Sequence, residues 1–199
     1  MDSFQTPNHE ETVKKLIGRS TYEFLNGSPF SYSLPLLVMS EALLQPHRGK
    51  IQFPVRKPIR EYSYLVAPAA KGFEGFLLAL SVHKGIISND EVDSGIPIGA
   101  IFAPTQKHSP LAEKFLLKPG NKHIVGHIYA IWDKNRNKVL HYDPDFFVKT
   151  IPEADKLVKD IFEEVKLAYQ VFIGDPNPTQ FLPPLFKPEP FLSPRFTNR

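Results

Sequence analysis

Cysteine is absent from this chain of 199 residues, which excludes disulfide bonds, thiolate metal sites and a cysteine nucleophile. Long apolar runs are also missing, and none approaches the roughly 20 residues that a membrane-spanning helix needs. The N-terminal sequence lacks the basic start and the apolar stretch of a secretory signal. Together these absences predict a cytoplasmic protein with no membrane partner.

The glycine signatures of several enzyme classes are missing too. The sequence contains no Gly-x4-Gly-Lys loop, no Gly-x-Gly-x-x-Gly turn and no Gly-x-Ser-x-Gly elbow. NTP hydrolysis, dinucleotide redox chemistry and serine hydrolysis therefore lack support.

Positive charge is in only slight excess. The chain has 24 Lys and Arg residues and 21 Asp and Glu residues, which gives a net charge of +3. This total fits an ordinary, slightly basic protein as well as a nucleic-acid-binding one. The distribution is more informative, because an acidic run at 155–164 lies on a different segment from a basic and histidine-containing cluster. The members of that cluster are Lys122, His123, His127, Lys134, Arg136 and Lys138.

Apolar residues repeat every three or four positions in five stretches, which predicts an all-α fold. These stretches are 11–25, 34–44, 62–86, 122–141 and 152–172. The longest contains Pro68, which should kink the helix or remove its first turns. Hydrophobic residues make up 42% of the chain, enough for a sizeable core, so we expect a helical bundle of four to five main helices.

The composition divides the chain into three regions. Residues 1–58 read as a short helical N-terminal region and a linker, and residues 59–174 as the main helical domain. Within that domain, 87–121 reads as a long connection with one short helix at 110–117. Residues 175–199 form a tail with seven prolines and four phenylalanines spaced five apart. Proline favours polyproline conformation and the aromatics favour burial, so the tail either packs on its own protein or a dimer mate, or binds a separate partner.

The chemistry candidates lie at the end of the fourth stretch, where Arg136 is followed by Asn137 and then by His141. A histidine of near-neutral pKa can take the proton of a ribose 2′-OH or protonate a leaving 5′-oxygen. An arginine can bind the phosphate with two hydrogen bonds and stabilise charge in the transition state. In a regular helix these two side chains would diverge by about 140°, so they converge only if the helix ends or distorts near His141, or if a dimer partner completes the site.

This segment resembles the Arg-x4-6-His motif of the HEPN superfamily, in which a polar residue commonly follows the arginine. The stretch 64–77 also resembles the helix that precedes the motif in the RNase LS family of HEPN toxins, where an acidic residue joins the arginine and histidine. The matching acidic residue here is Glu74, with Lys71 one turn earlier.

The resemblance implies an HEPN-like helical bundle and a metal-independent endoribonuclease, with no cofactor. Arg136, His141, Glu74 and Asn137 would be catalytic. Lys71, Lys134, Lys138 and His127 would contact RNA. It further implies a homodimer and a toxin–antitoxin or antiviral defence setting, with a protein antitoxin covering the RNA groove.

Each candidate also has an ordinary structural interpretation. Arg136 can cap the helix C-terminus, His141 can be a packed histidine, and Glu74 can simply pair with Lys71. His123 and His127 have a spacing that suits a metal, but no third ligand accompanies them, so no metal is expected. The alternative functions are a non-catalytic HEPN-like module that binds RNA, nucleotide or protein, and an unrelated helical interaction protein recruited through its tail.

Overall fold

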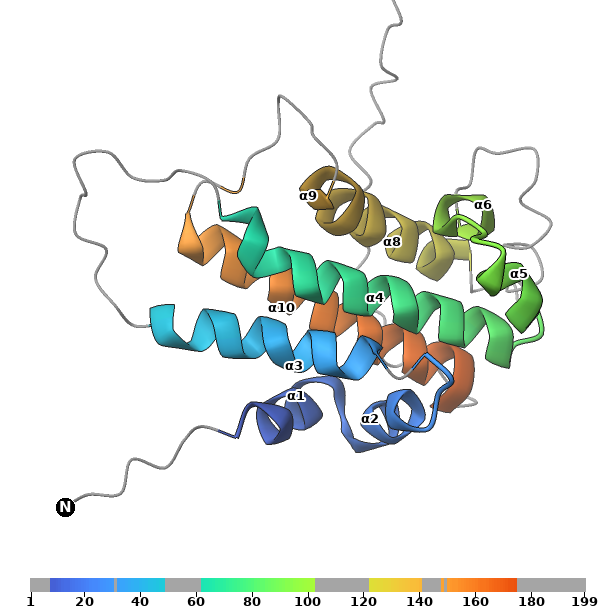
Figure 1. Ribbon diagram of the computed structural model, residues 1–199, viewed down its shortest axis with the longest axis horizontal. Coiled ribbons are helices and arrows are strands. Elements are labelled where there is room, and N and C mark those ends of the chain that lie inside the picture. The colour runs from blue at the N-terminus through green and yellow to red at the C-terminus, as the bar shows by residue number, and fades with distance from the viewer. Residues whose placement is uncertain are drawn as a thin grey trace, which may run out of the picture.

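The computed structural model describes residues 8–30, 32–48, 62–102, 122–140, 148 and 150–174 (Figure 1). The predicted short helix at 110–117, His141 and the tail at 175–199 lie outside these residues. The described residues contain helices and no strands, so the predicted all-α fold is confirmed for this part of the chain. The elements are α1 His9–Ile17, α2 Arg19–Asn26, α3 Ser33–Leu44, η1 Gln45–His47, α4 Ser63–His83, α5 Asn89–Asp93, α6 Ile98–Phe102, α8 Lys122–Trp132, η2 Asp133–Asn137, α9 Lys138–Leu140, α10 Ile151–Tyr169 and η3 Gln170–Gly174.

Helix α4 runs through the centre of the bundle and contacts α3 on one side and α10, α8 and α9 on others (Figure 1). The periodic apolar residues of the sequence become its buried faces. Among them, Phe73, Phe76 and Leu80 are fully buried. Because this helix is surrounded by other helices, it needs apolar side chains on more than one face.

The same helix is, within the described ranges, the one that is long and apolar enough to cross a membrane by length and composition alone. Its most apolar window has a mean hydropathy of 1.4, and 61% of that window is buried inside the protein. The sequence shows no uninterrupted apolar run of this length, because Lys71, Glu74 and two glycines interrupt the apolar residues of this helix. A central bundle helix has the same composition, because its faces contact other helices.

Two predictions about the elements were wrong. The stretch 11–25 is two helices, because Gly18 at φ 88° ends α1 and starts α2. Of the two effects predicted for Pro68, a kink or the loss of the first turns, the second is not observed, because α4 begins at Ser63 and continues through the proline, with Leu65 and Val66 buried in its first turns. The second wrong prediction concerns the connection that follows α4. The connection at 87–121 was predicted to hold one short helix at 110–117, and it contains α5 and α6. The sequence does carry a signal for α5, because Ser88 and Glu91 have the spacing of a capping box.

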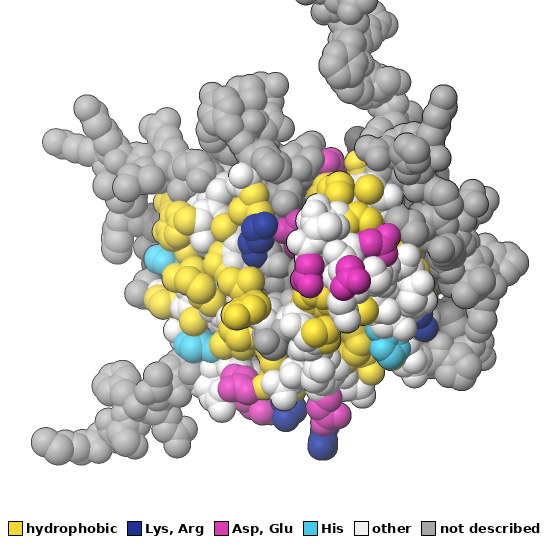
Figure 2. Space-filling view, turned by 45° about the vertical axis from the view of Figure 1, so that its right-hand side comes forward, with side chains coloured by type: hydrophobic (Ala, Val, Ile, Leu, Met, Phe, Trp, Pro, Cys, Tyr) yellow, Lys and Arg dark blue, Asp and Glu magenta, His cyan; other side chains and the backbone are white. Residues whose placement is uncertain are grey.

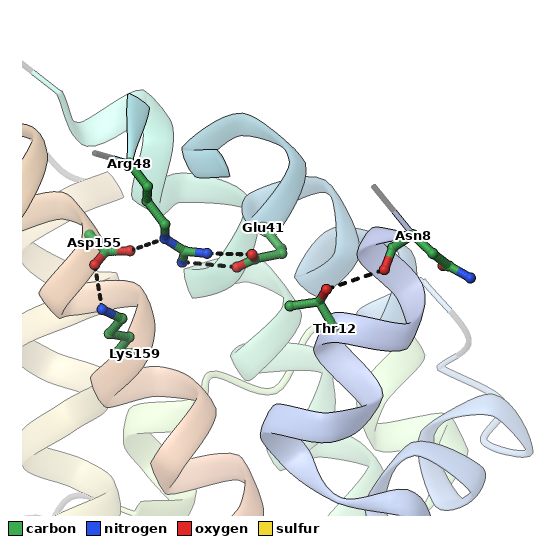
Figure 3. Close-up of polar contacts among 6 residues, drawn as sticks. All are labelled: Asn8, Thr12, Glu41, Arg48, Asp155 and Lys159. Atoms are coloured by element: carbon green, nitrogen blue, oxygen red, sulfur yellow. Dashed lines mark hydrogen bonds and ion pairs between the residues drawn. The ribbon is translucent and has the colours of Figure 1, made fainter. Parts of the chain in front are cut away.

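The helices of the N-terminal region share one hydrophobic core with α4 and α10. A charged bridge reinforces this packing (Figure 3). The Arg48 guanidinium donates two hydrogen bonds to the carboxylate of Glu41 on α3, and its Nε lies 2.8 Å from Asp155 Oδ1 on α10. Since Glu41 is only 2% exposed, this pairing is what makes its burial tolerable.

Candidate functional site

The predicted helix at 122–141 is present from Lys122 to Leu140, and a π-helical turn interrupts it. This turn, Asp133–Asn137, lies between α8 and α9 and includes the backbone of Arg136 and Asn137. In such a turn the backbone bonds run from i to i+5, and turns of this kind occur frequently at functional sites. A helix distortion was expected near His141, and the observed one begins eight residues earlier. The side chains of 136–138 and all of His141 lie outside the described residues.

Asn135 occupies the middle of the π-helical turn and is fully buried. Neither its Oδ1 nor its Nδ2 has a hydrogen-bond partner among the described residues. A buried polar group without a partner costs about 1–3 kcal/mol, and such groups are few in native proteins. The irregular turn, which includes Arg136, and a carboxamide with no partner among the described residues therefore coincide at the start of the motif.

Helix α4 contacts both η2 and α9, and α9 lies beside the N-terminal half of α4 in Figure 1. The fold thus brings the helix that carries Glu74 next to the helix that carries the motif. The Glu74 side chain is 17% exposed, and its Oε2 lies 2.8 Å from Lys71 Nζ. This ion pair is the ordinary interpretation of the two residues.

Two of the predicted RNA-contacting residues face α10 instead. His127 Nδ1 lies 2.5 Å from Oε2 of Glu164, and Lys134 Nζ lies 3.9 Å from Oδ2 of Asp160. Seven residues separate His127 from Lys134, which is close to two turns and places both on one side of the helix. Position 136 is nine residues beyond His127, half a turn further round a regular helix.

The His127–Glu164 pair is unusual because its acidic member is almost completely buried. Glu164 is 1% exposed, and its second oxygen, Oε1, has no hydrogen-bond partner in the described part of the chain. Contact with this carboxylate raises the pKa of His127 above its ordinary value, although burial opposes the shift, and Asp160 adds a smaller contribution in the same direction. The imidazole is therefore held toward its cationic form.

Sequence reasoning missed Asn135, Glu164 and the π-helical turn. Glu164 carried a usable signal, because it lies seven residues after Leu157 and so falls on the apolar stripe of its own helix. An acidic residue in such a stripe needs a basic partner on a neighbouring helix. The other two carried none, because a single inserted residue barely alters an apolar periodicity.

No candidate metal site lies among the described residues, and one cavity lies away from the motif. Within 8–174, excluding the undescribed segments, no group of three His, Asp or Glu side chains is arranged to hold a metal ion. A cavity of about 470 Å³ lies between the start of α2 and η3, and no predicted site residue lines it.

No family model, curated protein or solved structure matches this chain.

Proposed function

We propose that this protein is a metal-independent endoribonuclease of HEPN type, built on an HEPN-like helical bundle. The observation that supports this most is the coincidence of three features: the π-helical turn, Asn135 with no hydrogen-bond partner among the described residues, and the start of the Arg136–His141 motif. Proteins tolerate departures from local structural rules mainly at functional or strained sites. A further support is the contact of α4 with the motif helix, because α4 carries Glu74.

The reaction assigned to these residues is transesterification followed by release of product. His141 removes the proton of the ribose 2′-OH, and the 2′-oxygen attacks the adjacent phosphorus. The bond from phosphorus to the 5′-oxygen breaks, leaving a 2′,3′-cyclic phosphate and a 5′-hydroxyl that receives a proton from the conjugate acid of the base. Arg136 stabilises the charge on the phosphoryl oxygens, supported by Asn137, and Glu74 orients the pair or shares the proton transfer.

The wider setting belongs to the same proposal. A homodimer would bring two motifs to one RNA groove, lined by Lys71 and Lys138, in a cytoplasmic toxin or antiviral defence protein. A protein antitoxin would then cover the groove. His127 and Lys134 are assigned weaker RNA contacts, because both already lie beside carboxylates of α10.

Parallel binding and cleavage assays on the same variants test the assignment. Arg136→Ala, His141→Ala and Glu74→Gln should each keep the helical fold, and His141→Ala should cut RNA about 10²–10⁴-fold more slowly. His9→Ala, at the start of α1, is the matched control and should cleave like the wild type. Equal cleavage by His9→Ala and His141→Ala variants would reject the site.

A second candidate function is a non-catalytic HEPN-like binding module. The observation that favours it is that Lys71, His127 and Lys134 each lie within 4 Å of a carboxylate, which lowers their net attraction for phosphate. It predicts that the wild type binds RNA, nucleotide or a protein without cutting RNA, and that the His141→Ala variant binds equally well.

A further inference from the structure

Helix α3 is apolar on two opposite sides. Its inward side packs on α4 and contributes buried leucines to the core. Its polar side chains are also directed inward, which reverses the usual arrangement of a surface helix. The inward, buried residues are Ser33, Leu34, Leu37, Ser40, Glu41 and Leu44.

The outward side of α3 forms a second apolar stripe, which is exposed at Tyr32, Pro35 and Met39 and half-buried at Leu36 and Leu43. Its members follow one another at offsets of three, four and seven residues along the helix, which is the spacing of a buried face. Tyr32 is 81% exposed and Met39 is 51% exposed. We call this stripe the α3 face, and it consists of Tyr32, Pro35, Leu36, Met39 and Leu43.

The α3 face carries no charge, because the sole charged residue of α3, Glu41, is buried and bonded to Arg48. Figure 2 shows hydrophobic side chains gathered on the side of the molecule where Figure 1 places α3 and α4. Contiguous apolar surface of this kind marks a binding face.

We propose that the chain's own tail binds the α3 face, with Phe181 and Phe186 seated at its two ends. The match in length supports this occupant. Five residues of polyproline conformation span about 15 Å. The eleven helical steps from Tyr32 to Leu43 span about 16 Å.

The composition of the tail and the place where it begins also support the tail as the occupant. The tail segment 176–186 contains four prolines and two phenylalanines and no charged residue, which suits an uncharged face that offers a tyrosine, a proline and three aliphatic side chains. The described chain ends at Gly174, which borders the same cavity as Gly18 and Arg19 at the start of α2, and α2 contacts α3. The tail thus starts from the side of the bundle on which α3 lies. This proposal is independent of the proposed ribonuclease function.

Photo-crosslinking of the full-length chain tests the proposal. A benzoylphenylalanine at position 32 should crosslink to a peptide from 175–199, and mass spectrometry of mixed ¹⁵N-labelled and unlabelled protein should show that both peptides come from one chain. The same probe at position 156, which is exposed on α10, should give no tail crosslink. Combining the position-32 probe with Phe181→Ala and Phe186→Ala should lower the crosslink yield about tenfold, because two aromatic contacts are lost.

Other crosslinks would overturn the proposal. A link from position 32 to α3 of a second chain would make the face a contact between copies, and a link to a second chain's tail would make the docking intermolecular. No tail link, or an undiminished one in the double variant, would mean that the tail does not occupy this face. Circular dichroism should show the same helix content in every variant.

Discussion

Asn135 shows how one residue can mark a site before its chemistry is observed. Its side chain is fully buried in the π-helical turn and has no hydrogen-bond partner in the described part of the chain. A leucine has the same number and branching of side-chain heavy atoms and no amide that needs a hydrogen-bond partner. The asparagine is therefore better explained by a role in the adjacent motif than by stability.

Replacing Asn135 with leucine should stabilise the protein and reduce its activity. We expect the free energy of unfolding to rise by about 1–2 kcal/mol, since the desolvation cost of the amide disappears, while RNA cleavage falls. Urea unfolding measures the first effect. Asn89→Leu, at an exposed position on α5, is the control and should change stability by less than about 0.5 kcal/mol. A loss of stability in the Asn135→Leu variant would show that the carboxamide makes favourable contacts.

His127 and Glu164 form the other residue-scale feature, a half-exposed imidazole bound to a buried carboxylate. Because the pKa of His127 is raised in the folded protein, folding favours the protonated imidazole. The stability contributed by the pair is fully present below the unfolded pKa of about 6.5. It declines as the pH rises through the raised pKa of the folded state.

The pH dependence of a His127→Gln variant tests this pair. The difference in unfolding free energy between wild type and variant should be larger at pH 6 than at pH 9, and denaturant unfolding at the two pH values measures it. In a Glu164→Gln background the difference should become nearly independent of pH, because the carboxylate that raises the pKa is gone. A difference that is equal at both pH values in the wild-type background would contradict the assignment.

At the scale of the elements, the close packing of α3 on α4 depends on glycine. A Cβ added to Gly72 would lie 2.9 Å from the backbone oxygen of Ser33 and 3.0 Å from two carbons of Leu37. The contact involves backbone, so it cannot be relieved by rotating one side chain. This close approach holds α3 on one side of α4, while α10 and the motif helix occupy others.

Two glycine-to-alanine variants should therefore have opposite effects on stability. Gly72→Ala should lower the free energy of unfolding by about 1–3 kcal/mol, because the added methyl group overpacks the α3–α4 contact. Gly126→Ala in α8 meets no atom within 4 Å and should raise it by about 0.5–1 kcal/mol through helix propensity. Urea unfolding of both variants checks the prediction, and a stabilising Gly72→Ala substitution would contradict the packing described.

Helices that bury a long stripe could be predicted from the sequence. α4 and α10 were found from their apolar spacing, because each contacts several neighbours over many turns. The break at Gly18 was missed because its cause is a single backbone torsion, which leaves the apolar spacing on either side intact. α5 and α6 were missed because helices of five residues show no periodicity.

For the whole molecule, the sequence could propose candidate residues for the chemistry but could not predict which helices their side chains contact. Lys71 and Glu74 lie on α4, which contacts η2 and α9, whereas His127 and Lys134 lie beside acidic residues of α10. That outcome depends on the rotation of one helix against another. Contacts between residues far apart in the sequence, such as His127 with Glu164 and Lys134 with Asp160, fix this rotation, and no local pattern records it.

The ends of cleaved RNA test the proposed chemistry of the Arg136–His141 motif most directly. Purified protein should be incubated with mixed cellular RNA in EDTA, beside the His141→Ala variant, and the termini of the products identified. The wild type should give fragments with 2′,3′-cyclic phosphate and 5′-hydroxyl ends, and the variant should leave the RNA intact. Intact RNA under both folded proteins, or equal cleavage by both, would contradict this chemistry.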